Sequence, residues 1–191
     1  MIVVFGGAFN PPTIAHYEVA KHVTKMSEVS KLLFVPVGDH YEKAGLVPAF
    51  HRVNMLEVLT RTLPKTSVST IEIDANRAPK TMETLEKLQD LYPEKEIAFV
   101  MGADNLYDLP NWHACERLIK TFKFLVFNRQ KLDAQRFIEK TFPKNKENFI
   151  LVDDFITLDV SSTEYRTETD RSELLLPEME AYIKQHGLYE G

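Results

Sequence analysis

The sequence has very little cysteine. Among its 191 residues Cys115 stands alone, so no disulfide can form within the chain and no cysteine-based metal cluster can be built. Such sparing use of cysteine is typical of reducing compartments. Long apolar runs are also missing: none approaches the roughly 20 residues of a membrane span, and Met1–Gly6 lacks the length and basic lead of a signal peptide. We therefore expect a cytoplasmic protein with no membrane partner.

An excess of positive charge is absent too. The formal net charge is −5, whereas nonspecific nucleic-acid binding depends on clustered Lys and Arg that neutralise phosphates. The composition therefore disfavours a nucleic-acid partner. A small phosphorylated ligand remains compatible, because it needs only a local positive site. Whether identical subunits associate into a homo-oligomer is left open by the sequence.

Short apolar runs alternate with amphipathic segments along the whole chain. Most of the runs are continuously apolar, which is typical of strands covered on both faces. Strands are predicted at Ile2–Phe5, Leu32–Val37, Ser67–Ile73, Ile97–Met101, Phe124–Phe127 and Phe149–Val152. Helices are predicted near Ile14–Met26, His51–Leu63, Thr81–Tyr92, Trp112–Lys120, Asp133–Thr141, Ser162–Thr169 and Pro177–Gln185.

This alternation predicts an α/β fold with an open, mainly parallel sheet and helices on both faces. We expect one domain over residues 1–191, with the C-terminal helical part, about 161–191, packed on it. Ser67–Ile73 alternates between apolar and polar residues, which suggests a strand nearer the edge. Gly38–Pro48 is the longest irregular connection, and a loop of that length is often a lid or a binding loop.

The turn after the first predicted strand has the features of a phosphate site. It reads Gly6-Gly7-Ala8-Phe9-Asn10-Pro11-Pro12-Thr13-Ile14-Ala15-His16. Ligands of open α/β sheets bind at the carboxyl ends of strands, and the glycines let the backbone approach a ligand closely. The following helix offers free N–H groups and a positive dipole end. Neither G-x-x-x-x-G-K-[ST] nor G-x-G-x-x-G is present, which excludes the two common glycine motifs.

Thr13 and His16 are three residues apart and share a face in the first helical turn. Both side chains can donate hydrogen bonds to phosphate oxygens. The alternative interpretation is that His16, in helical phase with Val19, Ala20 and Val23, is a core histidine. The glycines and the strand-to-helix context favour the phosphate interpretation.

A second candidate segment lies far along the chain, at Val160-Ser161-Ser162-Thr163-Glu164-Tyr165-Arg166. Hydroxyls at a helix start accompany free backbone N–H groups. Arg166, one turn beyond Ser162, can bind phosphate oxygens with its planar guanidinium. Taken alone, this segment could equally be an ordinary helix cap followed by a surface arginine.

Together the two segments resemble the [TH]-x-x-H and I-S-S-T-x-x-R signatures of the nucleotidyltransferase superfamily. Val160 stands for the usual Ile, and Ala15 for a frequent Gly. The intervening chain resembles the nicotinate mononucleotide adenylyltransferase family: Met101–Asp104 with Trp112 is similar to its G-A-D…W arrangement, and Ala78–Leu85 to its S-Y-T-x-x-T-L segment. The resemblance implies a Rossmann-like fold of the nucleotidyltransferase type.

The resemblance also implies roles for individual residues. The catalytic residues would be His16, Thr13 and Arg166. ATP would be bound by Gly7, Ala8, Phe9, His16, Gly102, Asp104, Ser161, Ser162, Thr163 and Arg166. The acceptor nucleotide would contact Asn10, Lys43, Thr81 and Trp112, with the indole stacked on the pyridine ring. Arg52 is a weaker candidate, and the closing Tyr182–Tyr189 segment is interpreted as packing.

The implied reaction joins the AMP half of ATP to nicotinate mononucleotide, giving deamido-NAD and pyrophosphate. It needs positioning and charge stabilisation rather than a protein nucleophile. Mg²⁺ would accompany ATP and need few protein ligands, so no metal-ligating residues are assigned. Nicotinamide mononucleotide and pantetheine phosphate remain alternative acceptors, because Thr13, the Pro79-Lys80 pair and the Gly38–Lys43 loop depart from the family pattern. A noncatalytic nucleotide sensor on the same fold is the alternative from another class.

Overall fold

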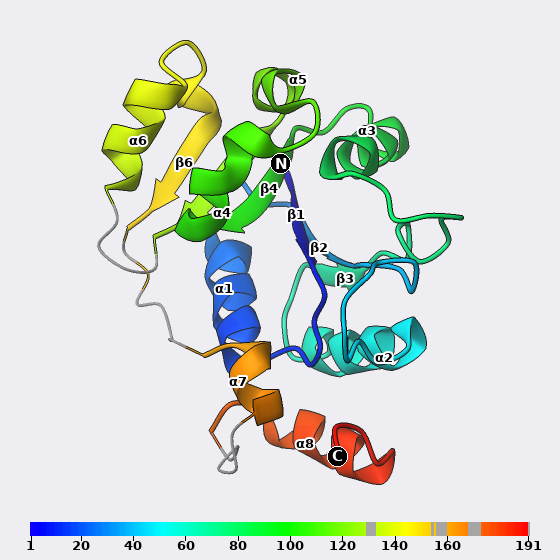
Figure 1. Cartoon of the computed structure of the whole chain (residues 1–191). Coiled ribbons are helices and arrows are strands. Elements are labelled where there is room, and N and C mark those ends of the chain that lie inside the picture. The colour runs from blue at the N-terminus through cyan, green and yellow to red at the C-terminus, as the bar shows by residue number, and fades with distance from the viewer. Residues whose placement is uncertain (129–132, 154, 156–159, 168–172, 191) are drawn as a thin grey trace. The chain divides into compact units, whose positions relative to one another are not determined.

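A computed structural model describes residues 1–128, 133–153, 155, 160–167 and 173–190 (Figure 1). The strands are β1 (Ile2–Gly7), β2 (Lys31–Pro36), β3 (Thr66–Val68), β4 (Ile97–Gly102), β5 (Lys123–Phe127) and β6 (Phe149–Val152). The helices are α1 (Ile14–Lys25), α2 (Ala49–Thr60), α3 (Thr81–Leu91), α4 (Ala103–Asp108), α5 (Cys115–Thr121), α6 (Ala134–Thr141), α7 (Ser162–Thr167) and α8 (Pro177–Gln185). Short 3₁₀ turns occupy Leu109–Asn111 and Lys146–Asn148. Within the described residues, no helix is long and apolar enough to cross a membrane.

The strands form a six-stranded sheet in the order β3-β2-β1-β4-β5-β6, with parallel pairing. The predicted open parallel α/β fold is confirmed. The apolar runs of Leu32–Val35, Ile97–Met101 and Phe124–Phe127 are buried along their whole length, as expected for strands covered on both faces. The strand predicted nearer the edge is β3, at one end of the order.

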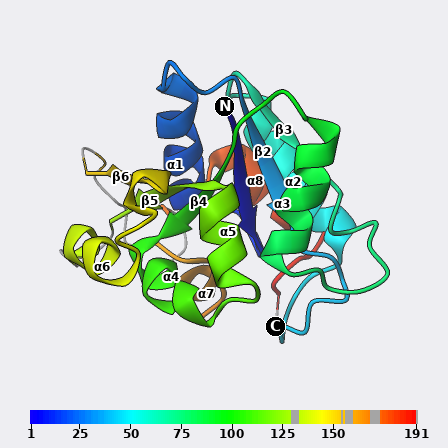
Figure 2. The ribbon, with the colours of Figure 1, turned by 90° about the horizontal axis from the view of Figure 1, so that it is seen from above.

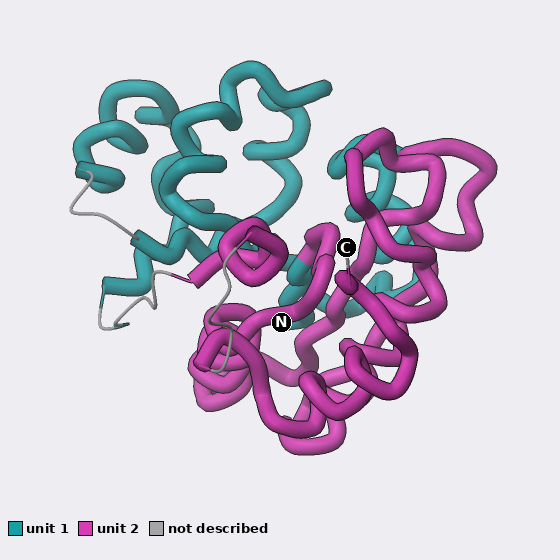
Figure 3. Tube along the Cα trace, turned by 60° about the horizontal axis from the view of Figure 1, so that its bottom comes forward, with its two compact units in different colours: residues 1–5, 79–157 teal, residues 6–78, 158–191 magenta. Residues whose placement is uncertain are grey.

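Contacts along the chain define two compact units (Figure 3). Unit 1 comprises residues 1–5 and 79–157, with the paired strands β4, β5 and β6 and the helices α3 to α6. Unit 2 comprises residues 6–78 and 158–191, with β2, β3 and the helices α1, α2, α7 and α8. In unit 2, both α1 and α2 contact β2 (Figure 2). The single domain expected from the sequence stays a prediction.

Two predicted elements differ clearly from the structure, and one helix was not predicted. The strand predicted at Ser67–Ile73 ends at Val68, and a turn follows in which the Thr70 hydroxyl donates to Asp74 at 2.7 Å. A side-chain hydrogen bond of this kind competes with strand pairing. The helix predicted from Trp112 begins only at Cys115, because Ala114 has a left-handed φ of 55°. The helix α4 was not predicted, because its six residues are too few to display a helical period.

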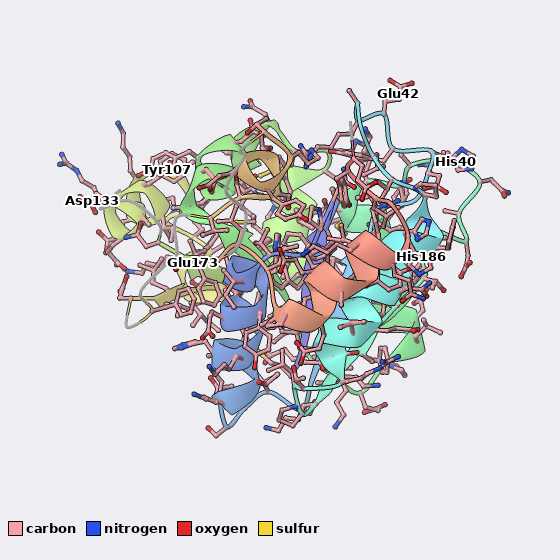
Figure 4. All side chains as sticks on the ribbon, turned by 90° about the horizontal axis from the view of Figure 1, so that it is seen from below. His40, Glu42, Tyr107, Asp133, Glu173 and His186 are labelled. Carbon is pink, nitrogen blue, oxygen red and sulfur yellow. The ribbon has the colours of Figure 1, made fainter. Side chains whose placement is uncertain are left out.

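The helix α8 is joined to α2 by a polar and aromatic cluster within unit 2. The Tyr182 hydroxyl accepts a hydrogen bond from Asn54 Nδ2 at 3.0 Å and lies 3.0 Å from His51 Nδ1. The rings of His51 and His186 are 5.3 Å apart, and Figure 4 labels His186 at the end of α8. Burial lowers the pKa of His51, and the neighbouring His186 lowers it further. The cluster therefore favours a neutral His51.

This cluster predicts a pH-dependent stability. Because the pKa of His51 is lower in the folded than in the unfolded chain, the unfolded chain takes up the proton first as the pH falls. Stability from His51 is complete above its ordinary pKa of 6.5 and declines below it. We expect the melting temperature to fall from pH 7.5 to 5.5, and H51Q to flatten that slope. H113Q, which removes an exposed histidine of unit 1, should leave the slope intact. A slope unchanged in H51Q would contradict this assignment.

Candidate active site

The first turn of α1 fixes the orientation of the His16 ring. The Thr13 backbone N–H donates to His16 Nδ1 at 2.9 Å, and the Thr13 hydroxyl lies 2.8 Å from the same nitrogen. A backbone N–H can only donate, so Nδ1 accepts, and the neutral ring carries its proton on Nε2. His16 is half-buried. The arrangement makes Nε2–H a donor of fixed orientation, as a phosphate contact requires.

Thr13 has a different contact from the one expected. Its side chain is buried, and its hydroxyl lies on His16 Nδ1 rather than facing outward. Because Nδ1 is unprotonated, the hydroxyl donates to it. Any influence of Thr13 on a phosphate in this arrangement is exerted through the imidazole, so Thr13 is better described as a residue that orients His16.

The Phe9 side chain packs against the same imidazole ring. Its side chain is buried, and its ring meets His16 edge-on at 5.1 Å and Phe34 of β2 at 5.6 Å. The Phe9 backbone has a φ of 48°, a left-handed conformation that costs roughly 1–2 kcal/mol in a non-glycine residue. Gly7 permits the close packing, since a Cβ there would lie 3.2 Å from the Phe9 ring. The residue with the left-handed backbone, Phe9, is thus in direct contact with the His16 imidazole.

The structure brings the two sequence motifs together within unit 2. Ser162 Oγ, at the start of α7, donates to the Pro11 carbonyl at 2.8 Å across 151 residues of sequence. Arg166 Nη1 donates to the Asn10 carbonyl at 2.6 Å and to the Ser162 carbonyl at 2.9 Å. The guanidinium is therefore anchored on the loop that leads into His16. The structure thus joins the second motif to the loop of the first, and a guanidinium is a group that binds phosphate oxygens well.

The other two hydroxyls of the second motif have contacts within α7. Ser161 and Glu164 cap the helix reciprocally: the Glu164 N–H donates to Ser161 Oγ at 3.0 Å, and Glu164 Oε2 accepts from the Ser161 N–H at 3.2 Å. This is a capping box. Arg166 Nη2 donates to Thr163 Oγ1 at 3.3 Å. Binding of ATP by Ser161 and Thr163 stays a prediction, whereas their part in shaping α7 is visible in these contacts.

Arg52 differs most from its sequence-based interpretation as a ligand contact. Its side chain is fully buried. Nε donates to the Val47 carbonyl at 2.9 Å, and Nη1 donates to the carbonyls of Val37 and Ala8 at 2.7 and 3.2 Å. Nη2 meets Asp39 Oδ1 at 3.1 Å. Burial lowers the pKa of Arg52, while Asp39 acts in the opposite direction. With these partners Arg52 holds the loop backbone, and its contact with a ligand stays a prediction.

Asn10 also differs from the expected acceptor contact. Its side chain is completely buried, with Nδ2 donating to the Gly45 carbonyl at 2.7 Å and Oδ1 accepting from the Val47 N–H at 3.1 Å. This burial is at odds with a direct contact to a nucleotide. Lys43, in the same loop, is exposed, and the neighbouring His40 and Glu42 point away from the body of the protein (Figure 4). A Lys43 contact with a ligand stays a prediction.

The remaining predicted residues belong to unit 1. Gly102 precedes α4, where a Cβ would collide with the Asp104 carboxylate, and Asp104 itself is exposed. Thr81 is the first residue of α3 and is half-buried. Trp112 Nε1 donates to Asp108 Oδ2 at 3.2 Å, and its ring meets Phe99 edge-on at 6.0 Å. Their proposed contacts with ATP and acceptor stay predictions.

Tyr189 is the residue that sequence reasoning missed most clearly. Its hydroxyl donates to Asn10 Oδ1 at 2.8 Å, although the closing segment was interpreted as packing alone. The available signal was the similarity of Tyr182–Tyr189 to a family pattern. No local feature of the sequence links it to a loop 179 residues earlier. Among the described residues, no group of three or more His, Cys, Asp or Glu side chains could hold a metal ion.

The chain is similar to known nucleotidyltransferases along nearly its whole length. A family model described as cytidylyltransferase-like matches residues 4–168. The probable nicotinate-nucleotide adenylyltransferase of Caldicellulosiruptor bescii is 30% identical over 98% of both chains. The nicotinate-nucleotide adenylyltransferase of Bacillus subtilis is 26% identical over 100% of this chain and 98% of its own.

Solved structures agree on the fold. The nicotinic acid mononucleotide adenylyltransferase of Plasmodium falciparum, complexed with APC, superimposes with a TM-score of 0.83. The alignment covers 99% of this chain and 96% of that one, at 24% identity. At this identity the likeness establishes the fold alone.

Proposed function

Because the chain belongs to the cytidylyltransferase-like family and, within it, to the nicotinate-nucleotide adenylyltransferases, we propose that it transfers AMP from ATP to nicotinate mononucleotide. The products are deamido-NAD and pyrophosphate. The observation that carries the proposal is the hydrogen bond from Arg166 of α7 to the Asn10 carbonyl, in the loop that leads into α1 and His16. His16 and Arg166 are two groups of different kinds that can bind phosphate.

In the proposed reaction an oxygen of the acceptor phosphate attacks the α-phosphorus of ATP. A new P–O–P bond forms, the bond to the β-phosphate oxygen breaks, and pyrophosphate leaves with the electron pair. The protein contributes position and charge stabilisation. We assign Nε2–H of His16 to an α-phosphate oxygen, where negative charge develops, and Arg166 to the β- and γ-phosphates. Thr13 holds the imidazole in the required tautomer.

We further propose that ATP enters as its magnesium complex. The ion then belongs to the substrate, because Mg²⁺ keeps most of its waters and binds phosphate oxygens readily. Backbone N–H groups of Gly7, Ala8 and Phe9, and of Ser162 and Thr163, would add fixed donors to the phosphates. Asp104 would hold the ATP ribose region, and Trp112, Thr81 and Lys43 the acceptor. Use of ATP and a single cysteine support a cytoplasmic location.

Pyrophosphate release tests the proposal directly. The purified protein with ATP and Mg²⁺ should release pyrophosphate when nicotinate mononucleotide is added, and the dinucleotide should be detectable by chromatography. Nicotinamide mononucleotide and pantetheine phosphate, assayed separately, should give lower kcat/KM. Higher efficiency with either would reassign the acceptor. Absence of turnover with all three, in folded protein that binds ATP, would instead favour the noncatalytic sensor.

A further inference from the structure

Through its side chain and its backbone carbonyl, Asn10 joins three parts of unit 2 that are distant in sequence. Its amide contacts Gly45 and Val47 of the β2–α2 loop and the hydroxyl of Tyr189, which follows α8. Its backbone carbonyl accepts the 2.6 Å hydrogen bond from Arg166. One fully buried residue thus connects the loop, the segment after α8 and the phosphate-binding arginine.

The polarity of these contacts is fixed by chemistry. An amide oxygen only accepts, so the Tyr189 hydroxyl must donate to Asn10 Oδ1. Burial raises the pKa of Tyr189, and this effect outweighs the opposing influence of Arg166 and Arg52. The phenol therefore keeps its proton. An aspartate could not replace Asn10 in the same role, because a carboxylate oxygen would face the Gly45 carbonyl.

The same contacts restrict Arg166. Of the five N–H donors of a guanidinium, the two on Nη1 bind the carbonyls of Asn10 and Ser162, and one on Nη2 binds Thr163. Because the group is planar and rigid, these bonds set the direction of its remaining donors. A shift of the Asn10 backbone would therefore tilt the guanidinium away from a bound phosphate.

We propose that Tyr189 is a positioning residue which, through Asn10, sets the orientation of Arg166 for the triphosphate of ATP. The inference rests on the proposed function and deepens it. Tyr189 reaches the site from two sides, since its hydroxyl bonds to Asn10 and its ring meets Tyr165 of α7 edge-on at 5.9 Å. Arg166 lies on that same helix. Tyr189 touches no reacting atom itself, so its effect is indirect.

The test compares Y189F with Y182F. Each variant loses one phenolic hydroxyl near the end of the chain, and each hydroxyl has polar partners: Asn10 for Tyr189, and His51 with Asn54 for Tyr182. Both should lower the melting temperature to a similar extent. Only Y189F should lower kcat/KM for ATP, by about three- to tenfold, the effect of one lost hydrogen bond. The Y182F value should remain within about twofold of the parent, because its partners lie outside the site.

A double-mutant cycle separates positioning from simple packing. In an R166A background, Y189F should cause no further loss of kcat/KM, because the residue through which it acts is gone. Equal losses in Y189F and Y182F, or losses in the double variant that multiply, would overturn the proposal. Dissociation constants for Mg·ATP, measured by calorimetry on the same variants, give the same comparison without turnover. A parent protein that binds ATP without reacting would therefore refute the proposed function alone.

Discussion

Replacing His16 by alanine should lower kcat by about 10²–10³-fold, the effect of removing one preorganised donor to a developing negative charge. The Nε2–H of His16 has a defined direction because Nδ1 is occupied by the Thr13 N–H and hydroxyl. The affinity for ATP should change far less, since Arg166 and the backbone donors remain. Single-turnover pyrophosphate release, with ATP binding measured separately by calorimetry, distinguishes these two effects.

H22A provides the matched control for this prediction. His22 lies on the same helix, six residues beyond His16 and therefore on a different face. H22A should keep kcat within about twofold of the parent. H16A also removes the acceptor for the Thr13 N–H, so a small loss of stability is expected, on the order of 1 kcal/mol. Turnover preserved in a folded H16A protein would show that the α-phosphate is bound elsewhere.

The strands and the parallel sheet could be predicted from the sequence, because one signal, the pattern of apolar residues, determines them. Continuous apolar runs such as Phe124–Phe127 are typical of strands covered on both faces, and they are buried as expected. The alternation of strands and helices then left few topologies, and the parallel sheet followed. Local chemistry also identified the start of α1, where Thr13 and His16 do interact.

Contacts between distant segments could not be predicted in this way. The family resemblance suggested Arg52 as a weaker candidate for a ligand contact, yet four partners allow its side chain to be fully buried. The roles of Asn10 and Tyr189 depend on a hydrogen bond across 179 residues, which no periodicity can indicate. The turn after Val68 was not predicted, because the alternation of apolar and polar residues continues beyond it and is typical of a strand. The hydrogen bond from the Thr70 side chain to Asp74 lies in this turn.

Replacing Arg52 by methionine should destabilise the protein by about 3 kcal/mol or more, because three backbone carbonyls lose a charged donor. Methionine can fill much of the volume but cannot bond to Ala8, Val37 or Val47. Lysine should restore only part of the loss, because one ammonium group cannot reach all three carbonyls that the planar guanidinium binds. Urea unfolding at pH 7, with unchanged m-value as a check of two-state behaviour, measures the difference.

Two control variants identify where the stability of Arg52 comes from. R61M, at the other end of α2, removes an exposed arginine and should change stability by no more than about 0.5 kcal/mol. D39N leaves the three carbonyl bonds intact and removes the charge of Asp39, whose side chain is 60% exposed. Because the amide oxygen can still accept from the Ala49 N–H, as Asp39 Oδ1 does at 2.8 Å, the cost should be below about 1 kcal/mol. A loss in D39N as large as that in R52M would assign the stability to the ion pair. The predicted order, with R52M far more damaging than D39N, would instead assign it to the bonds that hold the backbone of the turn after β1 and of the β2–α2 loop.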